Sequence, residues 1–466
     1  MPGTAPAIVD VASTGGWDTV FASHIADVNA AIIKAGTSPT SFSATDKEDG
    51  LSAVGTFGPW QIVPGGDGEL IWLRIPFKDT VVTTAEGPQP PLNGAAVVEV
   101  RLDFLHQDMA LAPDARKTFE LRLRTQGEAI AQVQQMGYDG AQPVFLIGIA
   151  LREMLEQWLN DNLVDFDHVF ATVDLNRTAD VGAFQWLQAT DVAYAYADLT
   201  TKGDGALGVL CMTEGRAATG LVAQLSPNCI PAGQRAGFLI AKNRLLKKLL
   251  LPCMPHMFAG ASPTDFALSP SGESIINVTE DVAFTVTEDG KDYTANIISF
   301  TLDIEGEELR MAATTRTTIS AGIHAFCETQ SFLGIQLITK PDNTQTLSFN
   351  DTRPAITNHW TEQSSDISLA EKVLGIIALV AAVAAVLTGG AAIGVAALVI
   401  GLVAGIMTVT TTMLEAVHKN DAPAITAMLL DSTAPINWGD TTDFVLTSAS
   451  LNDSLQLGGY LTAVSK

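Results

Sequence analysis

Metal-binding residue types occur at two places in this sequence, and neither has a complete ligand set. Cys253 and His256 form a C-x-x-H pair, but no second pair follows at the spacing of a zinc site. Asp165 and Asp167 fall on one face of an expected strand, where two carboxylates could bind calcium. Polar residues on a solvated strand face are the commoner explanation of that pattern. The sequence therefore predicts no metal site and no cofactor.

Catalytic signatures are equally scarce. The sequence has no G-x-S-x-G nucleophile turn, no Walker loop for phosphate and no H-E-x-x-H zinc motif. The seven histidines are scattered, and none stands near a cysteine or serine in the order of a known triad. Because triads assemble in space rather than in sequence, an enzyme stays an alternative. The leading expectation is a protein that is not an enzyme.

The charge balance limits the partners. The chain has 51 acidic and 26 basic side chains, a formal net charge of -25, whereas a nucleic-acid binder needs a basic face that releases counterions from phosphates. We therefore expect no nucleic-acid partner. One basic cluster on an expected helix is either the solvated face of that helix or a docking patch for an acidic partner or a lipid head group. The cluster consists of Lys242, Arg244, Lys247 and Lys248.

Two long amphipathic helices are expected to position the apolar residues. The first begins near Trp17 and ends at Gly36, and the second covers about residues 235–258. Alternating apolar and polar residues follow each helix, as in residues 298–304, and this pattern is typical of antiparallel strands with one buried face. The expected organisation is therefore two related halves, residues 1–235 and 236–466.

An apolar segment, residues 373–414, has no charged residue and interrupts the second half. Gly389 and Gly390 divide it, and its small residues at spacings of three and four allow two helices to approach closely. These features predict an apolar helical hairpin over residues 369–418 that turns at the two glycines. The residues expected to mediate membrane contact or assembly are Leu374, Ile377, Leu387, Gly389, Gly390, Ile393, Leu398, Ile400, Leu402 and Ile406.

A hairpin without a polar face needs a cover. Three locations are open to it: a groove or sheet of the same chain, an interface between protomers, or a bilayer entered after a conformational change. Its flanks carry few basic residues, so a resident membrane protein is the weakest alternative. The N-terminal residues have neither a basic region nor an apolar run, which argues against a Sec signal. We expect a cytoplasmic location or export without a Sec signal, with membrane association left open.

Four stretches of the chain, in this order, resemble a known family. They are "GWDTVFASHIADVNAAI", "GTFGPWQIVPGGDGELIWLRIPF", "FQWLQATDVAYAYAD" and "STAPINWGDTTDFVLTSASLNDSLQLGG", and together they span Trp17 to Gly459. The family is that of bacterial companion proteins encoded beside botulinum-type neurotoxins, within the tubular lipid-binding (TULIP) superfamily. The resemblance implies an α+β, TULIP-like fold in which strongly curved antiparallel sheets wrap long helices and enclose an elongated apolar groove.

The leading hypothesis is therefore a non-enzymatic accessory protein of a bacterial toxin system that binds a lipid or another apolar ligand. One alternative is a membrane-inserting, pore-forming toxin subunit that uses residues 373–413, and another is a scaffold that assembles through the same hairpin. A toxin component, a membrane and a homo-oligomer are thus the further partners considered. In the plainer interpretation, the predicted lipid-binding residues are ordinary core. These residues are Trp17, Val20, Phe21, Ile25, Val28, Phe238, Leu245 and Leu249.

Overall fold

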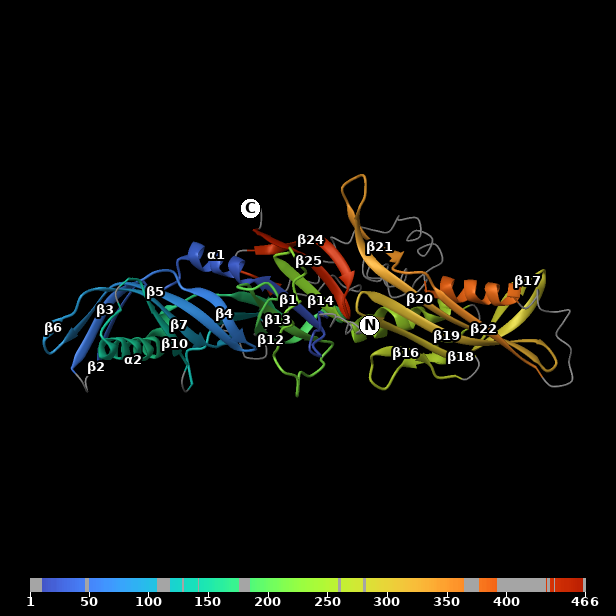
Figure 1. The fold of residues 1–466 in the computed structure, drawn as a ribbon, viewed down its shortest axis with the longest axis horizontal. Coiled ribbons are helices and arrows are strands. Elements are labelled where there is room, and N and C mark those ends of the chain that lie inside the picture. Colours follow the sequence, from blue (N-terminus) through green and yellow to red (C-terminus); the bar gives the residue numbers. More distant parts are fainter. Residues whose placement is uncertain are drawn as a thin grey trace, which may run out of the picture.

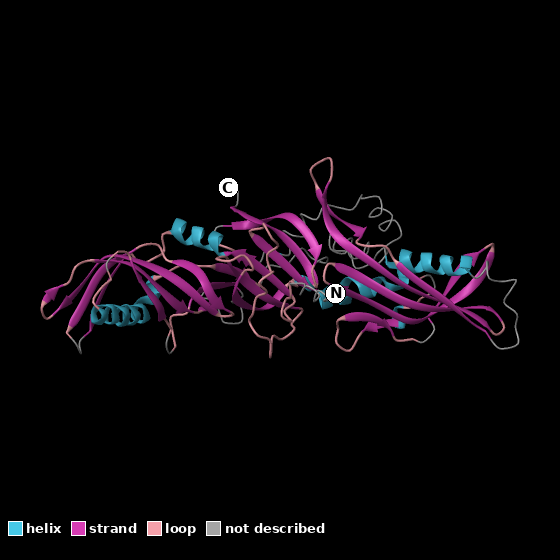
Figure 2. Cartoon of the chain, in the orientation of Figure 1, coloured by secondary structure: helices cyan, strands magenta, loops and turns pink. Residues whose placement is uncertain are grey.

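The molecule is elongated, and antiparallel sheets follow one another along its long axis (Figure 1). Strands make up most of the residues that the structure describes, and the helices lie against the sheets (Figure 2). The computed structural model describes residues 11–46, 50–106, 118–127, 130–140, 142–175, 185–258, 261–279, 282–363, 377–391, 433, 436–439 and 441–463.

A six-stranded antiparallel sheet occupies the centre. Its order is β12 (Ala189–Asp198), β13 (Gly205–Thr213), β1 (Thr19–His24), β14 (Ala236–Ala241), β25 (Ser454–Ala463) and β24 (Thr441–Leu451). In the middle, β1 pairs with β14, and Phe21 lies opposite Phe238 with ring centroids 5.9 Å apart. A hairpin flanks each of these strands, so the order of the sheet is symmetric about the β1–β14 pair. The expected boundary between residues 235 and 236 falls inside this sheet.

A seven-stranded sheet lies on one side of the centre (Figure 1). Its path is β10 (Gln132–Tyr138), β7 (Leu92–Val100), β5 (Leu70–Thr84), β3 (Leu51–Phe57) and β2 (Ser41–Asp46), with β4 (Gln61–Asp67) and β6 (Gly87–Pro88) paired to β5. A smaller sheet consists of β23 (Ile436–Asn437), β11 (Ala171–Asp174), β9 (Thr118–Leu123) and β8 (Leu102–His106). The helix α2 (Phe145–Asn162) packs against β2, β3 and β10.

An eight-stranded sheet lies on the other side of the centre (Figure 1). Its path is β15 (Phe266–Leu268), β16 (Ser274–Asn277), β18 (Lys291–Glu305), β19 (Glu308–Ser320), β20 (Ile323–Thr339) and β21 (Gln345–Asp351), with β17 (Val282–Glu288) paired to β18 and β22 (Ile356–Gln363) paired to β20. Residues 377–391 form a helix that buries Leu379, Val383 and Leu387. The Cys327 thiol of β20 lies 3.9 Å from the Val380 carbonyl oxygen, so this helix packs on the sheet.

Apolar burial is continuous across these sheets. One large cluster extends from Trp60 through Phe21 and Phe238 to Leu387. A second cluster, which includes Trp17, covers the opposite face of the central sheet, and a third lies beneath α2. The central sheet is therefore covered by side chains on both of its faces.

The predicted fold of long helices wrapped by curved sheets is wrong. The first expected helix is β1 followed by the shorter helix α1 (Ile25–Ala35). The second is β14 followed by α3 (Lys242–Leu245), a π-helical turn η4 (Leu246–Leu250), a 3-10 turn η5 (Leu251–Cys253) and α4 (Met254–Met257). Every residue of β1 and β14 is buried. Both faces of these strands are covered, so apolar residues occupy neighbouring positions and not only every second one. An apolar run of this kind also contains the spacings of three and four that are typical of a helix.

The predicted apolar hairpin is wrong in the part that the structure describes. Residues 377–391 form one helix that continues through Gly389 and Gly390, where the turn was expected. A Cβ atom added to Gly390 would lie 3.1 Å from Phe258 Cε1, so close packing accounts for that glycine. The rest of the predicted hairpin, residues 369–376 and 392–418, lies outside the described residues. Among the helices that the structure describes, none has the length and apolar character to cross a membrane.

Candidate functional site

A groove with a volume of about 480 Å³ lies beside α1. Its walls come from α1, from residues 167–172 that lead into β11, from Trp438 and from Leu461 of β25. Volumes of roughly 300–1,000 Å³ and mostly apolar walls are typical of small-molecule sites. The apolar side chains that line the groove are Val28, Ala30, Ala31, Ala35, Val169, Phe170, Trp438 and Leu461.

The sequence of α1 keeps this space open. The buried face of the helix consists of Ile25, Val28 and Ile32. The residues that line the groove beside this face are mainly alanines, whose side chains occupy little volume. His24 Nδ1 accepts a hydrogen bond from the Ala26 N–H at 3.2 Å at the start of the helix. Gly36 ends it with a left-handed φ of 63°. The helix is thus fixed at both ends.

Carboxylates border the groove and are held in ion pairs. Arg235 Nη2 lies 2.6 Å from Asp27 Oδ1, and this hydrogen bond raises the pKa of Arg235. Arg122 contacts Asp167 and lies 2.7 Å from Glu120. These oxygens are therefore engaged as hydrogen-bond acceptors, which suits the orientation of a polar ligand group more than proton transfer.

His168 and Ser23 are buried polar residues of the groove wall. For His168, the surroundings are defined by two contacts. Its Nδ1 lies 3.1 Å from Thr37 Oγ1, and its ring packs edge-on against Phe170 at 5.0 Å. Asp165, expected on a strand beside Asp167, instead ends a 3-10 turn. Across the part of the chain that the structure describes, no group of three or more His, Cys, Asp or Glu side chains is placed to hold a metal ion.

The Cys253 thiol, which belongs to the C-x-x-H pair, is buried. Burial raises the pKa of Cys253 to about 12. A thiol must lose its proton to bind zinc strongly, so this environment disfavours Cys253 as a metal ligand.

The eight predicted lipid-binding residues lie in two separate clusters. Trp17 and Val20 belong to the cluster on one face of the central sheet, where Trp17 Nε1 donates a hydrogen bond to the Val222 carbonyl at 3.1 Å. Each of the eight side chains is at most 5% exposed. Among them, Val28 also lines the groove beside α1. The six that belong to the large cluster on the opposite face are Phe21, Ile25, Val28, Phe238, Leu245 and Leu249.

The residues predicted for the hairpin are only partly described. Ile377 is exposed at the start of the helix, Leu387 is buried, and Gly389 and Gly390 lie within the helix. This helix lies against the chain's own sheet, which is one of the three locations that the sequence left open. The predicted hairpin residues that lie outside the described residues are Leu374, Ile393, Leu398, Ile400, Leu402 and Ile406.

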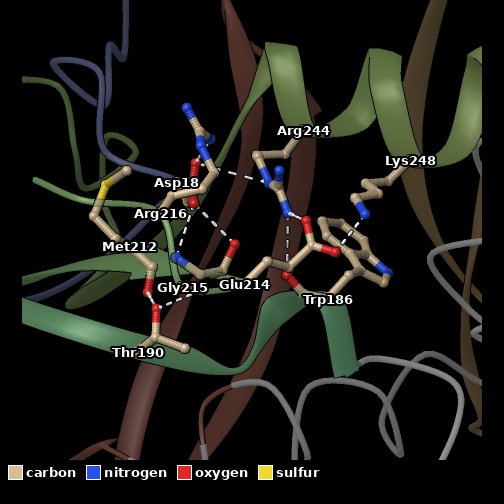
Figure 3. Close-up of polar contacts among 10 residues, drawn as sticks. Asp18, Trp186, Thr190, Met212, Glu214, Gly215, Arg216, Arg244 and Lys248 are labelled. Carbon is tan, nitrogen blue, oxygen red and sulfur yellow. Dashed lines mark hydrogen bonds and ion pairs between the residues drawn. The ribbon is translucent and has the colours of Figure 1, made fainter.

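The basic cluster of the second expected helix contributes to an internal network of ion pairs (Figure 3). Arg244 is buried between Asp18 and Glu214, with its Nε 3.7 Å from Asp18 Oδ1. Lys248 contacts the other carboxylate oxygen of Glu214. The Arg244 guanidinium also lies 5.9 Å from the centroid of the Trp186 ring. Arg244 is therefore neither solvated nor accessible to a docking partner.

Asp18 receives further hydrogen bonds in this network. The backbone N–H and the hydroxyl of Thr213 both donate to Asp18 Oδ2 at 2.8 Å, and Arg216 contacts Oδ1. The network thus connects the residue before β1 with the end of β13 and with α3.

Lys242, another residue of the basic cluster, forms a separate ion pair with Glu273 at 2.5 Å.

Glu214 links two of the basic residues. Burial alone would raise its pKa, but the hydrogen bonds and charges of Arg244 and Lys248 outweigh burial and hold the pKa of Glu214 below its ordinary value of 4.5. Glu214 also has a φ of 54°, a conformation that is uncommon for a residue with a side chain. Lys247 is the exposed member of the basic cluster.

Sequence reasoning missed the residues that complete the groove. Phe170, Trp438 and Leu461 come from segments far from α1 in the sequence. The adjacent alanines Ala30 and Ala31 were a local signal in the sequence, because a helix face with such small side chains leaves room beside it. No local pattern indicated which distant segments would face them.

Comparison with known proteins assigns the family. The family model for OrfX-like proteins, described as "Protein OrfX2/OrfX3/P47", matches residues 14–459. The chain is 29% identical to Protein OrfX3 of Paraclostridium bifermentans over 485 residues, which cover 97% of this chain and 98% of that protein. It is 28% identical to Protein OrfX3 of Clostridium botulinum (strain Kyoto / Type A2) over 484 residues, which cover 96% of this chain and 98% of that protein.

Two solved structures share the fold. P47 from Clostridium botulinum A2 has a TM-score of 0.58 and 16% identity, over 96% of this chain and 98% of that one. P47 of Clostridium botulinum E1 has a TM-score of 0.58 and 15% identity, over 96% of this chain and 99% of that one. The sequence resemblance to companion proteins of botulinum-type neurotoxins is confirmed at the level of the family, and the chain belongs to the OrfX-like family.

Proposed function

We propose that this chain is a non-enzymatic accessory protein of a bacterial toxin system and that it binds a small amphiphilic ligand in the groove beside α1. The family supports the accessory role. The observation that carries ligand binding is the groove of about 480 Å³ with its apolar lining. The lipid-binding role implied by the TULIP superfamily is kept, but of the eight predicted residues only Val28 lines this groove.

The chemistry of the groove favours an uncharged amphiphile. Its apolar part packs against Phe170, Trp438 and the alanines of α1, which all line the groove. Its head group meets the border, where Asp27, Glu120 and Asp167 accept hydrogen bonds. These carboxylates are paired with Arg235 and Arg122, and Lys34 also lines the groove. Charges of both signs therefore border the groove, which suits a head group without net charge. A volume of this size suits a single apolar chain or ring system.

Filling the groove tests this proposal. Ala31→Trp places a large side chain where the groove is lined by alanine, so we expect the affinity for the neutral fluorescent probe N-phenyl-1-naphthylamine to fall roughly tenfold or more. Titration of the purified full chain with this probe measures the affinity. Extraction followed by mass spectrometry identifies amphiphiles that co-purify with the wild type and are lost from Ala31→Trp.

Ala26→Trp is the matched control. Ala26 is also on α1, is exposed and does not line the groove, so probe binding should equal that of the wild type. If the probe binds Ala31→Trp as tightly as it binds the wild type, the groove is not the ligand site. Absence of saturable binding to the wild type would reject ligand binding itself.

A further inference from the structure

The N-terminal end of α2 exposes a group of large apolar side chains. Val144, Phe145 and Leu146 are 70%, 78% and 72% exposed, and Ile149 is 39% exposed. Residues 140–151 contain no charged side chain. We call these four exposed apolar residues the α2 tip. In Figure 1, α2 lies toward one end of the long molecule, away from the central sheet.

The arrangement of the α2 tip differs from that of a packing stripe. Phe145 and Leu146 are successive residues of α2 and project about 100° apart around its axis, and Val144 precedes them as the N-cap with an extended backbone. Their side chains therefore spread around the end of the helix. The residues of α2 that pack on the sheet, such as Leu151 and Leu155, follow the usual spacing of one helix face instead. The tip is thus not an extension of the buried face.

We infer that the α2 tip inserts into the interfacial region of a lipid bilayer that has no net charge. A stable interface with a folded partner or a second copy takes about 20–30 residues on each side, with a fully buried centre that is more apolar than its rim. The tip offers four exposed apolar side chains for such a centre. A bilayer is fluid and can cover exposed apolar side chains that point in different directions.

Charge selects the kind of bilayer. The chain has a formal net charge of -25, so an anionic leaflet repels most of its surface. The uncharged tip enters a zwitterionic leaflet without losing the hydration of a charged group. This surface is separate from the groove beside α1, so each proposal succeeds or fails without the other.

Vesicle binding of the full chain provides the first test. In co-sedimentation with phosphatidylcholine vesicles, we expect the double variant Phe145→Ser and Leu146→Ser to bind roughly tenfold or more weakly, because the transfer of two large apolar side chains is lost. The matched control is the double variant Val222→Ser and Val278→Ser, which removes two exposed apolar side chains elsewhere. This control should bind as the wild type does.

A fluorescent label gives a readout that does not depend on losing affinity. The four native cysteines are buried, so an NBD maleimide label reacts selectively with the new thiol in Leu146→Cys. We expect the label to brighten and its emission to shift to the blue on addition of phosphatidylcholine vesicles. The same label on Val222→Cys should not respond.

Four results would overturn the inference in whole or in part. The label on Leu146→Cys stays unchanged with vesicles, or the tip double variant binds vesicles as tightly as the wild type. Alternatively, light scattering shows wild-type dimers that the tip double variant abolishes, which would make the tip a protein interface. Tighter binding to vesicles that also contain phosphatidylserine would overturn the assignment to an uncharged bilayer.

Discussion

The helix α1 and the helical segment from α3 to α4 occupy corresponding places, because each directly follows one of the two paired strands at the middle of the central sheet. Their burial differs. α1 buries one face and leaves its alanines beside a groove. In the other segment, pairs of neighbouring leucines are buried together: Leu245 with Leu246, and Leu249 with Leu250.

Side-chain size explains the difference. Neighbouring leucines point to more than one side of a helix, so the segment needs cover on several sides. Part of that cover is the helix of residues 377–391, whose Gly390 lies against Phe258. Pro252 and Pro255 lack the N–H groups that would continue an α-helical ladder, and the segment changes helix type along its length. In α1, by contrast, one face is buried and the alanines beside it line the groove.

Among the substitutions that test this comparison, removal of the buried Arg244 is expected to lower the stability of the protein the most. Arg244→Met leaves Asp18 buried with less compensating charge, so the free energy of unfolding should fall by about 3 kcal/mol. The matched control beside α1 is Arg235→Met, since Arg235 and Asp27 are 46% and 40% exposed. Exposed pairs of this kind contribute about 0–1 kcal/mol. Urea denaturation followed by tryptophan fluorescence measures both, and equal losses would contradict the comparison.

A methyl group added at Gly390 tests how closely the helix of residues 377–391 packs on the end of α4. A Cβ atom there would lie 3.1 Å from Phe258 Cε1 and 3.3 Å from the Met257 carbonyl oxygen. Gly390→Ala should therefore lower the free energy of unfolding by about 1–3 kcal/mol. At Gly389 a Cβ atom meets nothing within 4 Å, so Gly389→Ala should raise it by up to about 1 kcal/mol through helix propensity.

Thermal denaturation of the two alanine variants decides this point. Opposite shifts of the melting temperature are expected from the same substitution at adjacent positions. If both variants melt above the wild type, the helix of residues 377–391 does not pack tightly on α4.

The smallest expected effect is the loss of the stabilising contribution of Glu214 at acidic pH. The pKa of Glu214 is held below 4.5 in the folded protein, so its stabilising contribution is complete above about pH 4.5 and is lost as the pH falls through the folded pKa. Glu214→Gln lacks this contribution. The difference in urea midpoint between the wild type and Glu214→Gln should therefore shrink as the pH is lowered below 4.5. A difference that is constant across this range would show that the ion pairs of Glu214 do not stabilise the fold.

Strands with one solvated face were predictable from the sequence, and the central strands were not. In β18 the expected alternation holds for Phe300, Leu302 and Ile304, which are buried. A bulge between Ile297 and Ser299 places Ile297 inside and turns Ile298 outward, which an alternating pattern does not indicate. In β1 and β14 burial on both faces removes the alternation.

The family could also be predicted from the sequence, whereas the groove could not. The family was predicted from the order of four specific stretches, which does not depend on assigning helices or strands. The groove was not predicted, because Ala31, Phe170 and Leu461 meet only through the tertiary fold. Burial patterns along the chain distinguish inside from outside, but they do not indicate where packing is incomplete.

The pairing of β14 with β25 has a consequence for the order of events during protein synthesis. Gly237 lies opposite Gly458, so one edge of β14 has no partner until the ribosome has made β25, the last of the described strands. Until then, this edge presents unpaired backbone groups beside apolar side chains, which invites association between nascent chains. The centre of the molecule is thus completed after translation of nearly the whole chain, and chaperones that shield this edge should raise the yield of folded protein.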